Sequence, residues 1–474
     1  MNSVAIIGAG LTGLTAAFRL RQRGIPATVY EASDRVGGVV QSWREAGYLA
    51  EHGPNTLLET SPKITDLIRA AGLQTRRLES DPRAANRYVV RGHRPVALPG
   101  TVVQFLGTRL FSLAAKFRLI REPFISRGTE EESVGAFVQR RLGREFLDYA
   151  IDPLVSGIYA GDPLRLSVQH AFPRVYDLEQ KYGSLIRGQL FGARERRNRP
   201  EVSKANARKL SFDQGLQVLP DALHFHVQDA VQLRTPVSGI ARRESAWDVV
   251  CGSAGTTGTA RHSAVLFAGS AYQLPHLRVD TQPAVDLSLF AEIRHPAVAS
   301  VVLGFRRSDV QHPLDGFGML VPKVEGLNIL GALFNSSLFP NRAPDGHVTL
   351  TVYLGGTRHP QLALSPHDRL VALALQDLQL LLGISGPPTF RHVAVFPQAI
   401  PQYELGYARF KAALDGVEAA VPGFFLAGNY RNGPSLSDSI LSGHEAAEKI
   451  AQFLNGSGTQ PTRPTPAQPI LTHS

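Results

Sequence analysis

Three glycines near the N-terminus stand at a spacing that can hold a pyrophosphate. Gly8, Gly10 and Gly13 follow the apolar run Val4 to Ile7, which reads as a buried parallel strand, and they lead into a helical pattern. Gly8 permits a tight turn, Gly10 lets the backbone approach phosphates, and Gly13 lets helix and strand pack closely. The helix N-terminus then offers N–H groups and the positive end of its dipole. The pattern predicts a dinucleotide site.

An acidic residue and a second glycine pair extend this motif. Residues 26–30 read as the next strand, and Glu31 at its end stands where a ribose hydroxyl needs an acceptor. Gly37 and Gly38 follow shortly afterwards, near the same phosphates. Folds built for NAD usually lack such a pair, so the combination favours FAD. The alternative is a glycine turn that merely connects strand and helix, and strand, acid and second pair together disfavour it.

A similar unit returns near the C-terminus. Residues 423–430 read as a short buried strand in which Gly428 permits close backbone approach. Ser435 then precedes a helical pattern that runs to residue 453. This unit can place a second helix N-terminus beside a flavin. A plain strand–helix unit that closes the domain is the alternative.

Composition and charge limit the classes of protein. A chain of 474 residues with 43% hydrophobic residues can bury two or three cooperating lobes. Its formal net charge of +10 suits binding of nucleic acid, anionic lipid or a polycarboxylate. We expect no nucleic acid as partner, because aromatic residues that could stack on bases are not interspersed among the basic ones. The single cysteine, Cys251, fits a reducing compartment, and we expect it to be buried on a strand.

The basic residues cluster in one part of the chain. No acidic residue lies between Asp81 and Glu122, whereas this stretch contains Arg83, Arg87, Arg91, Arg94, Arg109, Lys116, Arg118 and Arg121. Within it, residues 101–120 are apolar around most of a helical circumference, with a polar face at Arg109, Ser112 and Lys116. We expect a helix that lies on a membrane surface. The alternative is a core helix with a narrow solvent-exposed face. The basic residues beside it favour contact with anionic lipid.

The remaining patterns outline the other elements. Residues 61–72 predict a helix, 87–98 a strand pair with a turn at Gly92-His93, 101–190 mostly helices, and 367–382 a helix. Strands are expected at 231–240, 247–251, 264–269, 299–303, 319–321, 327–334 and 348–354. Residues 194–199 read as a solvated loop and 456–474 as a disordered tail. No apolar run is long enough to span a bilayer, and no signal peptide is expected because the first strand begins at Val4.

Several short stretches along the chain form a recognisable set. They are Glu51-His52-Gly53-Pro54-Asn55, Asn86-Arg87-Tyr88, residues 152–163, 215–219 and 316–322, residues 332–344, and Gly428-Asn429-Tyr430. In content and order, over nearly the whole chain, they resemble the flavin amine oxidase superfamily and, within it, the oxygen-dependent porphyrinogen oxidases.

The resemblance implies an α/β fold with α+β insertions. Its parts would be a Rossmann-like, p-hydroxybenzoate-hydroxylase-type FAD lobe, a mixed-sheet substrate lobe and a helical, membrane-facing lobe. We expect the FAD lobe at 1–80, 210–275 and 416–455, the substrate lobe at 81–98 and 276–415, the helical lobe at 99–209, and the tail at 456–474.

It also implies a reaction. Six electrons leave a porphyrinogen in three two-electron steps, each reducing FAD, which O2 reoxidises with release of hydrogen peroxide. We expect protoporphyrinogen IX as substrate because residues 331–344 look closer to mitochondrial and plant-type forms; coproporphyrinogen III is the alternative. Candidate partners are membrane lipid, ferrochelatase and a second copy of the chain. The expected location is cytoplasmic, peripheral on the inner membrane, and no metal is expected.

Substrate-binding residues follow from the same resemblance. Arg87 matches the arginine that pairs with a substrate propionate, a role that suits a guanidinium, and Phe334 matches a phenylalanine that stacks on a pyrrole. Gly157, Ala160 and Gly161 match a loop beside the porphyrinogen, where small side chains leave room. A surface arginine and an ordinary core aromatic are the alternative interpretations of Arg87 and Phe334. We find no certain general base.

The expected FAD contacts combine the motifs and the resemblance. They are Gly8, Gly10, Gly13, Glu31, Gly37, Gly38, Gly53, Pro54, Asn55, Val237, Gly428 and Ser435. FAD is expected to be non-covalent because no cysteine lies near the C-terminal motif, where monoamine oxidases attach their flavin. Rival interpretations are an amine oxidase or carotenoid desaturase, and a non-catalytic escort protein of prenylated GTPases that has the same nucleotide fold.

Overall fold

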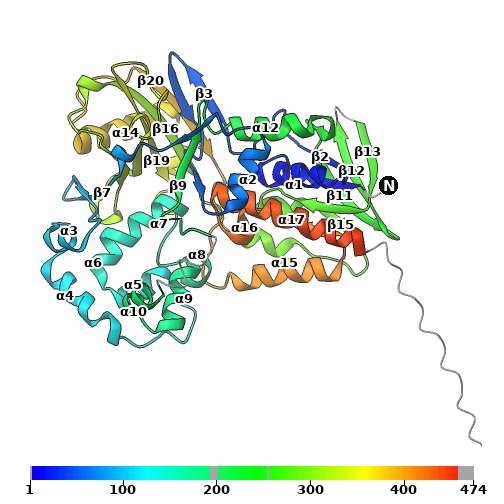
Figure 1. Cartoon of the computed structure of the whole chain (residues 1–474), viewed down its shortest axis with the longest axis horizontal. Coiled ribbons are helices and arrows are strands. Elements are labelled where there is room, and N and C mark those ends of the chain that lie inside the picture. The colour runs from blue at the N-terminus through cyan, green and yellow to red at the C-terminus, as the bar shows by residue number, and fades with distance from the viewer. Residues whose placement is uncertain (1–2, 193–200, 205, 254–255, 457–474) are drawn as a thin grey trace, which may run out of the picture.

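The computed structural model describes residues 3–192, 201–204, 206–253 and 256–456 of the chain. Figure 1 shows a parallel sheet flanked by α1, α12 and α17, a second sheet region around β16 and β19, and a group of helices from α3 to α10. The expected loop at 194–199 and nearly all of the expected tail lie outside the described residues.

The parallel sheet collects strands from distant parts of the chain. Its order is β10-β2-β1-β14-β21, with every pairing parallel. The strands are β1 (Val4–Ile7), β2 (Ala27–Tyr30), β10 (Val231–Gln232), β14 (Ala264–Phe267) and β21 (Phe424–Leu426). Helices α1 (Leu11–Gln22), α12 (Val218–Val227) and α17 (Leu436–Gly456) cover one face, and α15 (Ala408–Ala420) packs on the other. Covered faces explain why these strands are apolar without alternation.

A four-stranded sheet lies beside the parallel one, in the order β13-β12-β11-β15. Its strands are β11 (Val237–Arg243), β12 (Ala246–Ser253), β13 (Thr256–His262) and β15 (Arg278–Asp280). Cys251 lies on β12 as expected, but it is half-buried and not fully buried as we had predicted. It shares the covered face of β12 with the buried Trp247 and Val249, but it lies toward the end of the strand, at the margin of that core.

The second sheet region is a seven-stranded mixed sheet in the order β20-β16-β19-β18-β17-β7-β8. The strands are β7 (Asn86–Arg91), β8 (Arg94–Ala97), β16 (Val298–Arg306), β17 (Gly316–Leu320), β18 (Ile329–Phe334), β19 (His347–Gly355) and β20 (Phe390–Phe396). Helix α14 (His367–Leu382) covers one face and ends at Gly383, whose φ of +61° suits a glycine. Strands β7 and β17 form a parallel pair.

Short strands join the two sheet regions. Strands β3 (Ser42–Glu45) and β4 (Tyr48–Glu51) form a hairpin, and β5 (Leu57–Glu59), β9 (Arg208–Phe212) and β6 (Arg77–Glu79) form a three-stranded sheet with β9 in its centre. Helix α2 (Pro62–Ala70) starts at Ser61, whose side chain accepts the Lys63 N–H. The predicted helix at 61–72 is confirmed.

The helical region contains α3 (Val102–Gly107), α4 (Leu113–Arg121), α5 (Val134–Arg141), α6 (Arg144–Phe146), α7 (Asp152–Tyr159), α8 (Val168–Ala171), α9 (Pro173–Tyr182) and α10 (Leu185–Phe191). A fully buried Arg141 holds it together by pairing with Glu122 at 2.7 Å and with Glu179. Within the described part of the chain, no helix has the length and apolar character needed to cross a membrane.

The single helix predicted over 101–120 is wrong in one respect, because the chain breaks into α3 and α4. Thr108 is extended after Gly107, and Ser112 caps the second helix by accepting the Ala115 N–H. Lys116 donates to the carbonyls of Leu106 and Thr108 at 2.8 and 2.7 Å. The predicted polar face therefore turns partly toward the protein.

Candidate active site

The glycine turn after β1 leaves open space at the N-terminus of α1. Gly8 has a φ of +104°, and its N–H donates to Tyr30 O at 2.8 Å. A Cβ on Gly13 would lie 1.9 Å from Gly8 O, whereas one on Gly10 would meet no atom within 4 Å. The first turn of α1 has neither an acidic residue nor a capping side chain. Gly13 is thus required for packing, while the space at Gly10 fits an anion held by backbone N–H groups.

Glu31 lies directly beside this turn. Its Oε2 accepts the Ala9 N–H at 2.7 Å, and its Oε1 accepts the N–H and hydroxyl of Ser33 at 2.9 and 2.7 Å. A carboxylate has about four acceptor positions, so the group keeps capacity for a ribose hydroxyl. The structure therefore brings the expected ribose acceptor against the expected phosphate turn.

The second glycine pair folds back onto the first motif. The Gly37 N–H donates to Ala9 O at 2.8 Å, and Gly37 forms a parallel bridge with Gly10. A Cβ on Gly38, whose φ is +59°, would lie 3.3 Å from Gly10 Cα. Both glycines are thus needed where two stretches of backbone meet, next to the space at Gly10.

The C-terminal unit reaches the same end of the sheet. Gly428 follows β21, and its N–H donates to Ser442 Oγ at 3.0 Å. A Cβ on Gly428 would meet Gly269 O, just beyond β14, at 3.3 Å. A Cβ on Gly443 would lie 2.2 Å from Thr12 O. Helix α17 therefore packs directly on the first turn of α1.

The first turn of α17 contains its own carboxylate. Ser435 donates its hydroxyl and N–H to Asp438 Oδ2 at 2.6 and 3.0 Å. Lys204 Nζ lies 2.5 Å from the same oxygen. This charge occupies the positive end of the helix dipole. Both donors of Ser435 are therefore used within the chain, and only its oxygen can still accept a bond from a cofactor.

Val237 lies near the Glu31 side of the site. It begins β11, where it pairs with Cys251. The Thr235 N–H, two residues earlier, donates to Glu31 O at 2.8 Å. The start of β11 is therefore close to the expected ribose acceptor.

The turn Gly53 to Asn55 is tied to the seven-stranded sheet by a buried polar network. Asn55 Nδ2 donates to Gly53 O at 3.0 Å and to the Tyr353 hydroxyl at 2.6 Å, and that hydroxyl donates to Gly53 O at 3.0 Å. Asn55 Oδ1 accepts from Thr351 Oγ1 at 3.2 Å and from Asn335 Nδ2. Asn335 Oδ1 is buried and has no partner in the described structure. A buried acceptor of this kind is a position that a ligand group can complete.

Pro54 lies in the same turn and is half-buried. A Cβ on its neighbour Gly53 would lie 3.1 Å from Val39 O and 3.3 Å from the Phe396 ring. The turn is therefore packed between the second glycine pair and β20, and it joins the two sheet regions.

The three small residues expected in a substrate loop lie at the end of α7. Gly157 is inside that helix, so the predicted loop is wrong for this residue. A Cβ on Gly157 would lie 2.6 Å from Leu320 Cδ2, and one on Gly161 2.6 Å from Gln402 Oε1. Ala160 ends the helix with a φ of +48° and is buried. These small side chains thus allow close packing of α7 on its neighbours.

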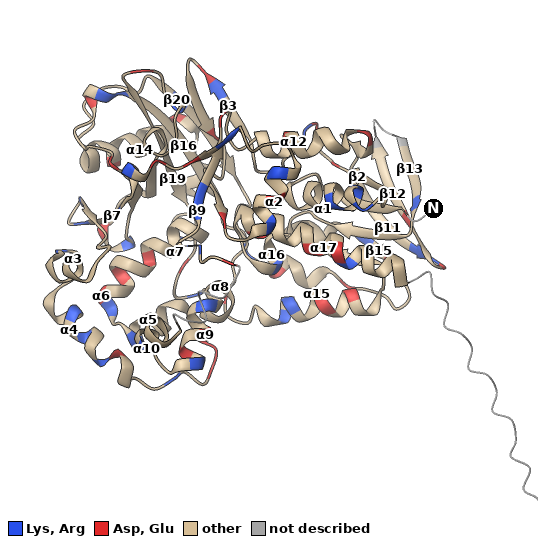
Figure 2. Cartoon of the chain, viewed as in Figure 1, with Lys and Arg blue, Asp and Glu red and all other residues tan. Residues whose placement is uncertain are grey.

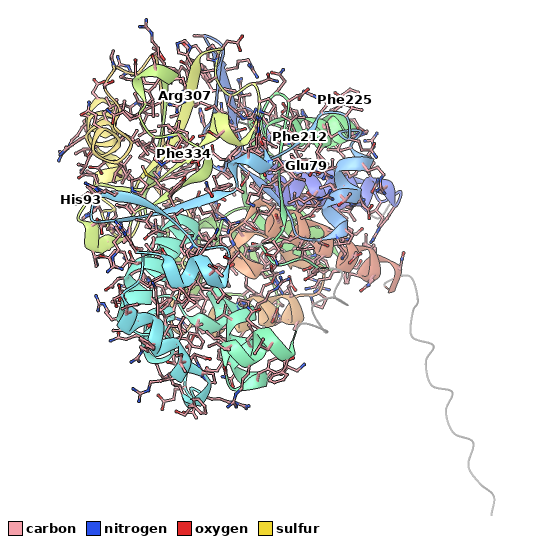
Figure 3. The ribbon with its side chains drawn as sticks, turned by 60° about the vertical axis from the view of Figure 1, so that its left-hand side comes forward. Glu79, His93, Phe212, Phe225, Arg307 and Phe334 are labelled. Carbon is pink, nitrogen blue, oxygen red and sulfur yellow. The ribbon has the colours of Figure 1, made fainter. Side chains whose placement is uncertain are left out.

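The structure does not bring Phe334 to the site. Its side chain is completely buried in the core between the sheet and α14, beside Tyr88 and His312. Figure 3 shows it within this sheet region, apart from Phe212 and Glu79 of the three-stranded sheet. Side chains alternate along a strand, so its neighbour Leu333 faces the other side. The core interpretation of Phe334 is therefore the correct one.

The sheet face opposite α14 carries half-buried side chains. Leu320 on β17, Leu333 on β18 and Tyr353 on β19 are all of this kind. Leu320 packs toward the helical region, and Tyr353 packs beside Ala160. This face can supply an apolar wall. This face was not predicted from the sequence, because the resemblance assigned the stacking role to Phe334, whose side chain lies on the opposite side of β18.

Arg87 is exposed on β7, opposite Gly318 of β17. Its neighbours Asn86 and Tyr88 both bind Asp315, through Asn86 Nδ2 at 3.0 Å and the Tyr88 hydroxyl at 2.5 Å. Asp315 is therefore held by the two residues on either side of Arg87. An exposed guanidinium in this position can bind a carboxylate from outside the chain.

Two ionisable groups beside the Gly53 turn have strongly shifted pKa values. Burial raises the pKa of Glu51 to about 7, against the opposing bonds from Ser42 Oγ at 2.6 Å and the Leu216 N–H at 2.8 Å. Burial and the stacked ring of His392 lower the pKa of His52 to about 4. At neutral pH His52 is therefore uncharged and only weakly basic.

Comparisons with known proteins agree with this geometry. The sequence pattern of flavin containing amine oxidoreductases matches residues 11–451. The chain is 34% identical to protoporphyrinogen oxidase 2 of Arabidopsis thaliana, over 95% of this chain and 94% of that protein. It is 28% identical to coproporphyrinogen III oxidase of Bacillus subtilis, over 95% and 98%. A crystal structure of a candidate protoporphyrinogen oxidase from Exiguobacterium sp. 255-15 superposes with a TM-score of 0.79 at 24% identity, covering 96% of this chain and 99% of that one.

Proposed function

Because the chain belongs to the family of flavin containing amine oxidoreductases, we propose that it oxidises protoporphyrinogen IX to protoporphyrin IX with non-covalent FAD. The family assignment makes it a flavin-dependent oxidoreductase. The choice of substrate is supported by sequence identity over nearly the full length. This identity is 32–34% to plant protoporphyrinogen oxidases and 28–29% to coproporphyrinogen III oxidases.

The residues around the glycine turn fit FAD. The pyrophosphate would lie at Gly10 and the N–H groups of the first turn of α1, and a ribose hydroxyl would bind Glu31. The adenine end would lie near Val237, and the ring end near Gly428 and the turn at Gly53. Non-covalent binding is supported by the position of the single cysteine on β12, at the Val237 end of the site.

When bound, FAD takes the electron pairs removed from the substrate and passes them to O2, which gives hydrogen peroxide. The protein's own residues bind and orient the substrate. Leu320, Leu333 and Tyr353 would form an apolar wall for a flat tetrapyrrole. Arg87 would hold a propionate with two parallel hydrogen bonds and thereby fix the ring orientation. His52 is uncharged at neutral pH and therefore places no positive charge beside the Gly53 turn.

Turnover of the two porphyrinogens tests this proposal. The purified holoprotein should oxidise protoporphyrinogen IX with a higher kcat/KM than coproporphyrinogen III, measured by the growth of porphyrin fluorescence. A strong preference for the four-carboxylate substrate would overturn the choice of substrate. Arg87→Ala should raise KM by about tenfold, the value expected for a lost bond between charged groups, while FAD stays bound. Unchanged kinetics would remove Arg87 from the site.

A further part of the proposal is that α3 and α4 rest on an anionic membrane surface. Val102, Val103, Leu106, Leu113, Phe117, Ile120 and Phe124 are between 63% and 82% exposed. Three basic side chains lie on α4, those of Lys116, Arg118 and Arg121, and Figure 2 shows basic positions on α4 next to uncharged α3. Apolar side chains beside basic ones suit insertion among anionic headgroups. With the reducing compartment indicated by the single cysteine, we propose the cytoplasmic face of the inner membrane.

Vesicle sedimentation can test this contact with a matched control. Phe117 on α4 and Phe225 on α12 have nearly equal exposure, 67% and 70%. Phe117→Asp should reduce binding to vesicles that contain anionic lipid, whereas Phe225→Asp should not. Equal binding by both variants would contradict the proposed membrane face.

A further inference from the structure

Two adjacent basic residues on β9 face opposite sides of their sheet. Arg208 pairs with Glu59 at 2.6 Å and with Glu79 at 3.1 Å, two carboxylates on the neighbouring strands. Lys209 is the next residue, so its side chain points the other way. It is half-buried, and its Nζ lies 5.8 Å from the centre of the Phe317 ring. The side chain of Lys209 forms no ion pair among the residues that the structure describes.

Phe317 also connects this lysine to Arg87. The pairing of β17 with β7 places Gly316 opposite Asn86 and Gly318 opposite Arg87, so Phe317 is the extra residue of a bulge. Such bulges redirect a side chain and occur often next to active sites. The backbone of Arg87 on β7 therefore lies beside that of Phe317, while Lys209 reaches the Phe317 ring from another sheet. Burial, followed by the nearby charge of Arg87, lowers the pKa of Lys209.

Among the residues that the structure describes, three acidic side chains near Lys209 have other partners. Asp81 binds Arg83 at 2.6 Å, Asp315 binds Asn86 and Tyr88, and Glu79 also binds Arg77 at 2.6 Å. Two cations that lie close together repel each other and lose hydration. Carboxylates brought by a ligand relieve both effects, because each forms a charge-assisted hydrogen bond.

We propose that Lys209 is a second carboxylate-binding residue of the substrate site, so that Arg87 and Lys209 each bind one of two neighbouring propionates across the Phe317 ring. This inference rests on the proposed function and makes it more specific. The two propionates of protoporphyrinogen IX lie on adjacent rings along one edge, which suits two cations separated by one aromatic side chain. Lys209 would thus contribute to orientation and affinity, and Phe317 would support its position.

The test compares charge removal with ester formation. Lys209→Met keeps the length and apolar packing of the side chain and removes its charge, Lys209→Arg restores a charge, and Arg208→Gln changes the opposite face of the same strand. Binding of protoporphyrin IX and of its dimethyl ester is measured by fluorescence titration in detergent, together with kcat and KM for protoporphyrinogen IX.

We expect Lys209→Met to weaken binding of the diacid and raise KM by about tenfold, with little change in kcat. The dimethyl ester should bind equally to the wild type and to this variant. Lys209→Arg should restore most of the affinity, and Arg208→Gln should behave as wild type. Equal losses for diacid and ester, or no loss for either, would overturn the role of Lys209 while leaving the proposed function intact. A wild type that oxidises neither porphyrinogen would remove the proposed function, and this inference with it.

Discussion

Helices α1 and α17 both follow a glycine-containing turn, α1 directly after β1 and α17 after β21 and the short helix α16 (Asn429–Asn432), yet their first turns differ. That of α1 has no acidic residue, and a Cβ on Gly10 would enter open space. That of α17 contains Asp438, which accepts both donors of Ser435 and pairs with Lys204. A helix N-terminus attracts one anion strongly. The N-terminus of α1 is therefore open to an external phosphate, whereas the N-terminus of α17 already has the carboxylate of Asp438 beside it.

Two glutamates that end strands show a second contrast. Glu31 follows directly after the last residue of β2, is half-buried, and accepts three hydrogen bonds from N–H and hydroxyl groups. Glu51 ends β4, is only 2% exposed, and has a pKa raised to about 7 by burial. The first therefore keeps an acceptor position for a ligand, while the second is a buried structural acid that is partly protonated at neutral pH.

Gly10→Ala at the start of α1 should have the largest effect on FAD affinity of the variants considered for the two helices. Its φ of −70° suits alanine and the new methyl meets no protein atom, so the free energy of unfolding of the apoprotein should change by less than about 1 kcal/mol. FAD affinity should fall at least about a hundredfold, because the methyl takes the space of the pyrophosphate. Titration of the apoprotein with FAD measures this, and unchanged affinity would place the phosphates elsewhere.

Glu51→Gln should remove a pH dependence of stability. Folding raises the pKa of Glu51 from 4.5 to about 7. The contribution of this carboxyl to the free energy of unfolding is therefore fully present below pH 4.5 and is lost as the pH rises through 7. The difference corresponds to about 3 kcal/mol. Urea unfolding at pH 5 and pH 8 should show this loss in the wild type but not in the variant. Identical pH profiles would contradict a protonated Glu51.

Glu31→Gln should weaken FAD binding by about tenfold, because a charged acceptor for a ribose hydroxyl becomes a neutral one. The amide has one acceptor oxygen, so it keeps either the bond from the Ala9 N–H or those from Ser33, and a moderate loss of stability should accompany the loss of affinity. FAD titration and thermal unfolding of the apoprotein separate these two effects. A loss of stability without a loss of affinity would make Glu31 a purely structural residue.

Asp438→Asn should have the smallest effect. Because the α17 terminus is not prepared for the phosphates, FAD affinity should change by less than about threefold, and stability by about 1 kcal/mol through the weakened N-terminal charge. A large gain in FAD affinity would show that the Asp438 carboxylate repels the phosphates of the cofactor, which would contradict a purely structural role for this residue.

The local motifs were predictable because their signals are short in range. Gly8, Gly10 and Gly13 with Glu31 indicated a strand, a turn and a helix, and the structure has each of them in place. Pro366 and Gly383 bracket α14, which matches the predicted helix at 367–382. Both cases depend on backbone conformations that only neighbouring residues determine.

Positions that depend on register or on distant pairing were not predictable. Phe334 and Leu333 are neighbours, and a shift of one residue along a strand exchanges the core face for the opposite one. Lys209 approaches Phe317 only because β9 pairs with β5 and β6 while β17 pairs with β7. The break between α3 and α4 depends on the Ser112 cap and on Lys116 reaching back to two carbonyls.

Anaerobic mixing of the FAD-loaded protein with protoporphyrinogen IX shows whether electrons pass from the porphyrinogen to the bound flavin. We expect the yellow flavin absorption to bleach, and we expect admission of oxygen to restore it while porphyrin fluorescence and hydrogen peroxide accumulate. A flavin absorption that stays unchanged with every porphyrinogen would contradict the proposed reaction.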